Sequence, residues 1–533
     1  MSLLVSGTFA KEIDRYAIDR LGIPSLRLME RASRALADEA ERMLGELGKA
    51  REPHISFFCG TGNNGADGLC CAFMLLERGY QDIDITVTGK RDKRTEEFIF
   101  HEERLKAAGI DINYYEESGR LTEYDPDEYA PDMAVDALFG IGLKREVRGA
   151  FLETIDFINE LKVSWGSRII SADVPSGLDS DRGLNMCGDR PPVKADLTVT
   201  FGFAKTGLFL GCGQAVSGRV ITADIGYPEG ITEYIPHNNT DIIEITDEKI
   251  DKFRYRLKRR GPNANKSTYK KLLLLAGSRG MAGAAYLSGL AALRSGIGMV
   301  RYFGPEENRI ILQTLLPEAM YESFGKELQF EGLKAAFSWA DCYLLGPGLS
   351  VSKESEELVR AFARLWQEKR EDKSFLIIDA DGLNILAGAP ELRKLLFSEK
   401  TVITPHVGEM ARLTGSSISD IKSDLLGAAE KLAHLEGVNV ILKDAVTAAA
   451  CADGSLSLNI KGSAALAKAG SGDVLSGTVA GISAVLGGRL EDSLPIAVYI
   501  HGMAGAAAAG QDSEHGVLAR EVADSIPKVM GSL

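Results

Sequence analysis

The segment ALAKAGSGDVLSG, residues 465–477, places an acidic residue directly behind a glycine turn and at the start of a predicted helix. Gly470 and Gly472 allow a tight turn, so the free N–H groups of the first helical turn can bind an anion such as a phosphoryl group. Asp473 then either complements the helix dipole or takes a proton from a hydroxyl group that receives the phosphoryl group. The motif alone leaves both interpretations open.

A second glycine-rich segment, CGTGNNGADGLCCAFML, follows a strand that is predicted to end at Cys59. A helix is predicted from about Ala66, so backbone amides and the side chains of Asn63 and Asn64 surround a potential pyrophosphate site. The spacing differs from the G-x-G-x-x-G pattern of dehydrogenases. Two consecutive Asn residues, followed by Asp67 between glycines, are more polar than a structural turn requires.

Two further loops, VDALFGIGLKRE (135–146) and ADVPSGLD (172–179), each place an Asp at a predicted strand end. Asp136, Asn64 and Ser176 together offer hard oxygen ligands that suit an alkali or alkaline-earth ion. Asp173 is either a general base or a helix cap.

Composition indicates a globular protein of several domains. The 533 residues exceed one ordinary core, and 45% hydrophobic and 26% charged residues are globular values. We find no apolar run that could span a bilayer and no secretory signal. The seven cysteines lack zinc spacing and predict reduced thiols in a cytoplasmic protein. A net charge of −14 argues against nucleic acid as a partner, and the basic run RLKRR (256–260) is interpreted as a solvated linker.

Short apolar runs alternate with helical stretches in both halves of the chain, which is typical of parallel strands joined by crossover helices. The pattern lapses over 228–268, in YPEGITEYIPHNNTD and KRRGPNANKS. The sequence therefore predicts two tandem α/β domains, 1–235 and 236–533. In open sheets of this kind, ligands bind at the carboxyl ends of the strands.

The motifs of the first half, GNNGADG, DALFGIGL, DVPSGLD and TVTFGFAKTGL, stand in the order found in the NAD(P)HX epimerase family, and LMERAS resembles its N-terminal helix. The second half resembles the ADP-dependent NAD(P)HX dehydratase family through GSRGMAGAAYLSGLAALRSGIGMV, GPGL, IDADGLNIL, TPHVGEM, LKDAVT and AGSGDVLSG. The resemblance covers nearly the whole chain. It implies a Rossmann-like three-layer α/β/α domain followed by a ribokinase-like α/β/α domain.

The resemblance also implies the chemistry. The substrates would be NADHX and NADPHX, in which water has added at C6 of the reduced nicotinamide ring. The first domain would interconvert the R and S epimers. The second would dehydrate the S epimer by phosphoryl transfer from ADP, or alternatively ATP, to the C6 hydroxyl, with Asp473 accepting the proton before phosphate is expelled. Magnesium, potassium and a homo-oligomeric assembly are expected with it.

Site residues follow motif by motif from the resemblance. In the dehydratase domain, substrate is expected at Ala284, Gly348, His406 and Asp473, and nucleotide at Lys443, Asp444, Ala445, Val446, Thr447 and Gly472. In the epimerase domain, substrate is expected at Asn63, Asn64, Gly65, Ala66, Asp67, Gly140, Ile141, Gly142, Leu143, Lys144, Arg145, Glu146 and Asp173. Asp173 is the candidate for proton transfer near C6. The potassium ligands are expected to be Asn64, Asp136 and Ser176.

The chain departs from the family pattern at three places. Ala66 stands where a second glycine is usual, Asn265-Lys266-Ser267 replaces His-Lys-Gly, and Asp444 replaces a glycine, so that a carboxylate comes near the ADP phosphates and would repel them unless it points away or binds the metal. Two alternatives stay open at this point. One is a ribokinase-like small-molecule kinase with an N-terminal binding module, and the other is a non-enzymatic interaction scaffold.

Overall fold

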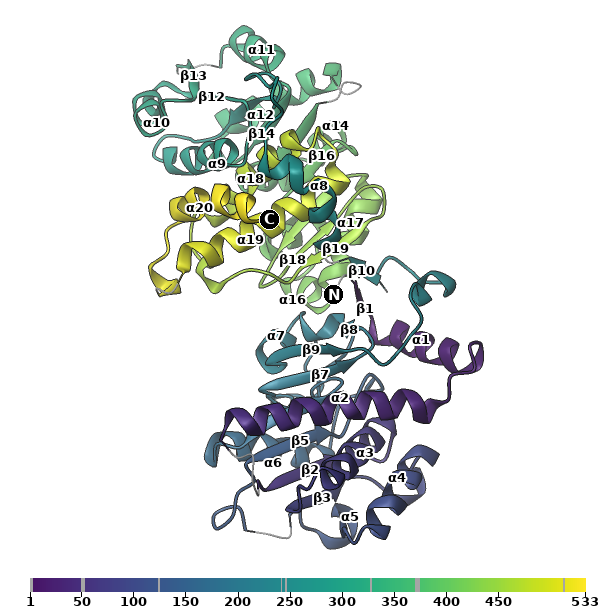
Figure 1. The fold of residues 1–533 in the computed structure, drawn as a ribbon. Helices are drawn as coiled ribbons and strands as arrows, with labels where there is room; N and C mark the ends of the chain where they lie inside the picture. The colour runs from purple at the N-terminus through teal and green to yellow at the C-terminus, as the bar shows by residue number, and fades with distance from the viewer. Residues whose placement is uncertain are drawn as a thin grey trace. The chain divides into compact units, whose positions relative to one another are not determined.

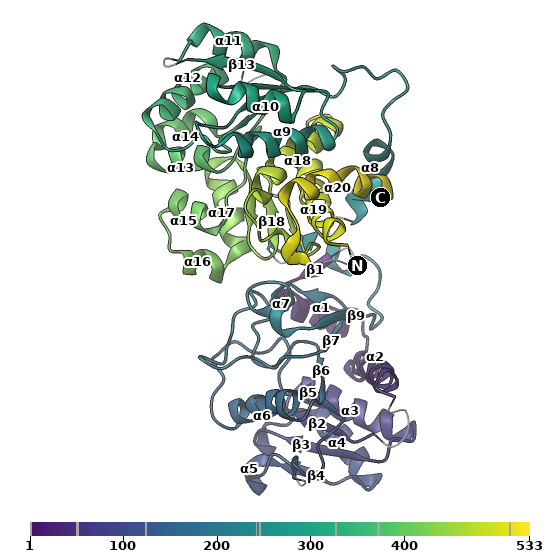
Figure 2. The same cartoon turned by 90° about the vertical axis from the view of Figure 1, so that its left-hand side faces the viewer.

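Strands that are buried on both faces form a central sheet in each half of the chain (Figures 1 and 2). The computed structural model describes residues 3–48, 53–122, 125–240, 242–244, 247–325, 328–369, 374–510 and 513–533. The chain divides into two compact units, Leu3–Ile243 and Glu244–Leu533. Each unit is α/β with a largely parallel sheet, which confirms the predicted fold class. The predicted domain limits place their boundary shortly before this division.

The sheet of unit 1 has the strand order β4-β3-β2-β5-β6-β7-β9, and every neighbouring pair is parallel. All residues of β2 and β5 are buried, as expected for strands covered on both faces. The strands are β2 (Ile55–Cys59), β3 (Ile83–Val87), β4 (Ile112–Tyr114), β5 (Met133–Ala137), β6 (Arg168–Ala172), β7 (Leu197–Phe201) and β9 (Arg219–Ala223), and β1 (Leu3–Val5) pairs with β8 (Ala204–Lys205).

Helices cover both faces of this sheet. On one face, apolar residues of α2, α3 and α4 share a core with β2 and β3, and on the other α6 packs against β5 and β6 (Figure 2). The helices are α1 (Gly7–Asp19), α2 (Ser25–Glu46), α3 (Asn63–Glu77), α4 (Glu96–Ala107), α5 (Tyr115–Ser118), α6 (Ala150–Ser164) and α7 (Gly213–Val216). This arrangement is the predicted three-layer sandwich.

The sheet of unit 2 runs β13-β12-β11-β14-β15-β16-β17 in parallel and continues with antiparallel β18 and β19. Its strands are β10 (Ile242–Glu244), β11 (Lys271–Leu275), β12 (Met299–Pro305), β13 (Met320–Phe324), β14 (Cys342–Leu345), β15 (Phe375–Ile378), β16 (Thr401–Ile403), β17 (Asn439–Lys443), β18 (Thr447–Ala450) and β19 (Leu456–Asn459). The carboxyl ends of β15 and β17 carry Asp379 and Lys443.

Helices also cover both faces of this second sheet. One core joins α9, α18, α19 and α20, and on the other side Phe337, Phe362 and Trp366 of α11 and α12 pack around Tyr343 of β14. The helices are α8 (Asp247–Lys258), α9 (Ala282–Arg294), α10 (Arg309–Leu315), α11 (Phe330–Trp339), α12 (Lys353–Lys369), α13 (Asp381–Gly388), α14 (Pro390–Leu396), α15 (Val407–Thr414), α16 (Ile418–Ser423), α17 (Leu425–Glu436), α18 (Ser471–Val485), α19 (Leu490–Ala509) and α20 (Ala519–Ser532). Within the described ranges, no helix has both the length and the apolar character needed to cross a membrane.

Candidate active sites

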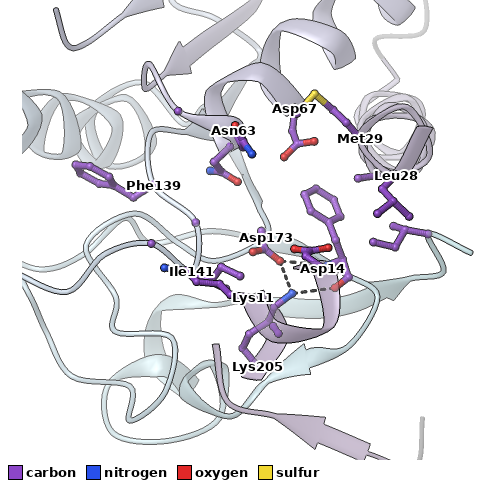
Figure 3. A pocket seen from close by; sticks show the side chains of 18 of the residues that line it. Lys11, Asp14, Leu28, Met29, Asn63, Asp67, Phe139, Ile141, Asp173 and Lys205 are labelled. Atoms are coloured by element: carbon purple, nitrogen blue, oxygen red, sulfur yellow. Dashed lines mark hydrogen bonds and ion pairs between the residues drawn. The ribbon is translucent and has the colours of Figure 1, made fainter. Parts of the chain in front are cut away.

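Unit 1 contains a cavity of about 600 Å³ at the carboxyl ends of its strands (Figure 3). The helices α1 and α2, the glycine turn after β2, the loop after β5 and the segment from β7 to β8 contribute to its wall. Of the residues that the sequence assigns to the epimerase substrate, the cavity brings together Asn63, Asn64, Asp67, Gly140, Ile141, Gly142, Leu143 and Asp173. Gly65, Ala66, Lys144, Arg145 and Glu146 lie outside its lining.

The glycine turn after β2 is tighter than the sequence predicts. A Cβ atom on Gly65 would lie 1.7 Å from the carbonyl oxygen of Gly60, so only glycine fits there. The turn therefore passes directly into α3 at Asn63, three residues before the predicted start at Ala66. Ala66 is fully buried in the core beneath α2 and α3, so its methyl group faces that core and does not line the cavity.

Asp173 forms the most strongly polar contact of the cavity. The Lys205 ammonium donates to its Oδ1 at 2.6 Å, and the Thr200 hydroxyl and the Phe201 amide donate to the same oxygen. Asp173 and Lys205 are only 6% and 2% exposed. Asp173 also has a φ of +65°, a conformation that few non-glycine residues adopt. The backbone at Asp173 is therefore strained in the conformation that holds its carboxylate against the buried Lys205 ammonium.

Sequence reasoning missed several polar residues that line the same cavity, among them Lys11, Asp14, Lys205 and Tyr227. Lys205 lies inside the motif TVTFGFAKTGL, and this motif could have identified it as a candidate site residue. Asp14 follows Ile13 on the partly buried side of α1 and accepts a hydrogen bond from the Tyr227 hydroxyl. Burial raises the pKa of Asp14, and the nearby Asp173 adds to that effect. Burial likewise raises the pKa of Asp67 well above its usual value.

Asp136 and Ser176 lie together, as predicted, beneath the loop after β5. The fully buried Asp136 carboxylate accepts hydrogen bonds from the Ser176 amide, the Ser176 hydroxyl and the Ser171 hydroxyl, at 2.8, 2.5 and 2.8 Å. These donors are neutral, and burial raises the pKa of Asp136. The Oδ1 atom of Asn64 faces Gly140. In the described part of the chain, no three His, Cys, Asp or Glu side chains are arranged to hold a metal ion.

Unit 2 has a second polar cluster around the start of α18. Gly470 precedes this helix with a φ of 90°, and Asp473 lies in its first turn. A Cβ atom on Gly472 would lie 3.3 Å from the Lys443 Nζ atom, so the predicted Lys443, Gly472 and Asp473 come together. Free backbone amides, an ammonium group and a carboxylate therefore meet in one place, which suits phosphoryl transfer.

Lys443 connects this cluster to Asp379, whose Oδ1 atom accepts its hydrogen bond at 3.1 Å. Asp379 follows β15 and was not among the predicted residues, although IDADG contains it. Burial and the negative charge of Asp379 raise the pKa of Asp473 to about 7, while the Lys443 ammonium acts in the opposite direction. Asp473 is thus poised to change protonation state near neutral pH.

His406 pairs with Lys443 through a parallel β-bridge and precedes α15. Its Nδ1 atom accepts hydrogen bonds from the amides of Gly408 and Glu409, and the Glu409 carboxylate accepts from the His406 amide. Because Nδ1 is an acceptor, neutral His406 carries its proton on Nε2. Burial raises the pKa of Glu409 to about 7. His406 caps a helix and remains exposed beside the cluster.

The remaining dehydratase residues fall into two groups. A Cβ atom on Gly348 would lie 2.9 Å from the Ala284 methyl group, so these two predicted residues adjoin each other. Ser350, two residues further, donates its amide hydrogen to Asp381, which is one of the charges acting on Asp473.

Asp444 and Ala445 form an exposed turn after β17, whereas Val446 is buried. Ser267 and Lys266 belong to an exposed turn before β11.

Comparison with known proteins gives the same division. A family model described as NAD(P)H-hydrate dehydratase matches residues 272–528, and one described as YjeF-related protein N-terminus matches residues 25–207. A solved ADP/ATP-dependent NAD(P)H-hydrate dehydratase from Bacillus subtilis, co-crystallized with ATP/Mg2+, is 28% identical, with a TM-score of 0.43 and coverage of 52% of this chain and 95% of that chain.

Several curated relatives match over nearly the whole chain. A bifunctional NAD(P)H-hydrate repair enzyme of Thermofilum pendens is 32% identical, covering 98% of this chain and 95% of that protein. The enzyme of that name from Escherichia coli is 31% identical, covering 97% and 92%. The chain belongs to the family of bifunctional NAD(P)H-hydrate repair enzymes.

Proposed function

We propose that this repair enzyme divides its two reactions between its two units, with epimerisation in the cavity of unit 1 and dehydration at the start of α18. The activity as a whole is the repair of hydrated NADH and NADPH. One observation supports the division: each unit holds its own carboxylate, the buried Asp173 or the half-buried Asp473, in a site that also has a glycine turn at a helix N-terminus. The repeated arrangement fits one proton-transfer site in each unit.

In unit 1, the loops 60–67 and 139–143 are proposed to hold the hydrated dinucleotide. The start of α3 presents backbone amides to its pyrophosphate. Asp173 then lies at the reduced ring and moves the proton of the C6 hydroxyl group. The Lys205 ammonium holds the Asp173 carboxylate in place through a 2.6 Å hydrogen bond. Lys205 is thus a positioning residue for Asp173.

Potassium is proposed to bind between Asn64, Asp136 and Ser176. The fit rests on Asp136, a fully buried carboxylate whose described hydrogen-bond donors are all neutral. A buried charge without a counter-charge is costly. A bound cation would neutralise it and would fix the loop that carries Gly140, which faces Asn64 and Asp173.

In unit 2, the first turn of α18 and Lys443 are proposed to hold the phosphates of ADP or ATP, and Asp473 to accept the proton of the C6 hydroxyl group as the phosphoryl group arrives. Magnesium, when bound with the nucleotide, would neutralise phosphate charge. Phosphate is a far better leaving group than hydroxide. It departs with the electron pair of the C6–O bond, assisted by the ring nitrogen. Loss of a proton from C5 then restores the reduced nicotinamide. The exposed turn position of Asp444 is compatible with phosphate binding at Lys443.

The direct test is incubation of the purified protein with a mixture of R and S hydrates, ADP, magnesium and potassium. We expect chromatography to show loss of both epimers, release of AMP and phosphate, and recovery of absorbance from reduced nicotinamide. A small-molecule kinase would instead leave a stable phosphorylated product. A scaffold would leave both epimers and the nucleotide unchanged.

Dehydration is expected to weaken as the pH falls below about 7, because Asp473 accepts a proton only when ionised. Asp379→Asn removes a negative neighbour that raises the pKa of Asp473. The acidic limb of the rate profile, on which dehydration weakens as the pH falls, should therefore move to lower pH. Lys443→Met removes a positive neighbour and moves the limb to higher pH. Profiles of kcat/KM against pH for the three proteins measure both shifts. Limbs that move in the same direction in both variants would show that another group titrates.

A further inference from the structure

We propose that Asp14 is the second catalytic residue of unit 1, a proton donor that acts together with Asp173 during epimerisation. The inference rests on the proposed function of the cavity. Asp14 belongs to none of the motifs that suggest the family, and its helix, α1, precedes the segment matched by the N-terminal family model. Its assignment comes from where the fold places it.

The geometry brings Asp14 into the same cavity as Asp173 and Lys205. Figure 3 shows the three side chains entering it from α1, from the end of β6 and from β8. Tyr227, which follows β9, donates its hydroxyl hydrogen to Asp14 Oδ1. Asp67 of α3 lines the cavity as well. Side chains from five separate elements therefore surround the space in which the reduced ring would lie.

The two carboxyl groups Asp14 and Asp173 have different partners. Asp173 faces the Lys205 ammonium, whereas the described residues give Asp14 a phenol and no direct ion pair. The charged and titratable groups that act on Asp14 are Tyr227 and Lys205, which lower its pKa, and Asp173, which raises it, with burial as the largest influence and in the raising direction. Asp67 adds a further carboxyl group nearby. The different partners of the two carboxyl groups fit different roles, with Asp14 as the acid and the ion-paired Asp173 as the base.

An acid and a base together complete a balanced epimerisation. The Asp173 carboxylate takes the proton of the C6 hydroxyl group, the C6–O bond becomes a carbonyl, and the C6–N1 bond breaks with its electron pair passing to N1. The Asp14 carboxyl group gives its proton to N1. Rotation about the C5–C6 bond exposes the other face of the aldehyde. Ring closure then returns the N1 proton to Asp14 and the Asp173 proton to the oxygen, so no other reactant is consumed.

The test is the pH dependence of kcat/KM for epimer exchange in the full-length protein. Asp14→Asn is expected to lower kcat/KM by about 10² to 10⁴-fold and to remove the limb on which activity falls as the pH rises, since that limb reports loss of the donor proton. Tyr227→Phe removes a hydrogen bond that lowers the pKa of Asp14, so it should move the same limb to higher pH. Thermal unfolding of each variant, compared with that of the wild type, checks that unit 1 is folded.

Asp67→Asn is the matched control, because Asp67 is another carboxyl group of the cavity with a raised pKa. It should retain an alkaline limb, whereas Asp14→Asn loses it. The proposal is overturned if Asp14→Asn keeps its rate and its limb, if Asp67→Asn loses the limb, or if Tyr227→Phe leaves the limb unmoved. This inference alone is overturned if the wild type exchanges epimers and Asp173→Asn is inactive, but Asp14→Asn is fully active. A wild type without epimer exchange would overturn the proposed function too.

Discussion

Asp473→Asn is expected to abolish dehydration of hydrated NADH and NADPH while epimer exchange continues at the wild-type rate. The substitution keeps the size and shape of the side chain but removes the carboxylate charge that is proposed to accept the C6 hydroxyl proton. A positioned base contributes about 10² to 10⁴-fold to a rate, so we expect a loss of that size in kcat. Nucleotide affinity should change little, because Lys443 and the helix amides remain.

The measurement is ADP-dependent recovery of reduced nicotinamide, with the R-to-S ratio followed in the same sample by chromatography. Asp251→Asn, a change of the same type at a 66% exposed side chain on α8, should leave both activities intact. If Asp473→Asn lowered dehydration and epimerisation equally, the two units would not hold independent sites. If it left dehydration unchanged, phosphoryl transfer would not depend on this carboxylate.

The α/β architecture could be predicted because local sequence patterns indicate its strands and helices. Strands such as β2 and β5 are short, fully buried runs in which most residues are apolar. The start of α3 was placed too late for a physical reason. The helix begins at Asn63 because Gly65 lets the turn approach the Gly60 carbonyl to a distance no side chain permits, and a contact between backbone atoms leaves no periodicity in the sequence.

The polar partners in the sites were harder to predict, because they come from elements far apart in the chain. Asp14 and Tyr227 are separated by more than two hundred residues and meet only in the folded cavity. Within α1, Asp14 resembles any polar residue of an amphipathic helix. Lys205 and Asp379 stood inside recognisable motifs, but their importance lies in the ion pairs that they form with Asp173 and Lys443. Pairing of this kind follows from sheet topology.

Asp173→Asn is expected to abolish epimer exchange and to leave ADP-dependent dehydration of the S epimer intact. The loss should reach about 10² to 10⁴-fold, as for removal of any positioned base. Asparagine is the appropriate replacement, because it tolerates the φ of +65° found here better than most residues do. Its amide oxygen can still accept hydrogen bonds at the position of Oδ1, so the backbone at the end of β6 should keep its conformation.

The substitution also removes the charge partner of the Lys205 ammonium, and this residue is only 2% exposed. Breaking a buried pair from one side costs about 3 to 5 kcal/mol, so loss of activity through unfolding must be separated from loss of a base. Asp173→Asn combined with Lys205→Met removes both charges. We expect thermal unfolding of this double variant to recover toward that of the wild type while epimer exchange stays absent. Recovery of exchange together with stability would contradict a catalytic role for Asp173, because an ion pair that only supports the fold can be replaced by apolar packing and a base cannot.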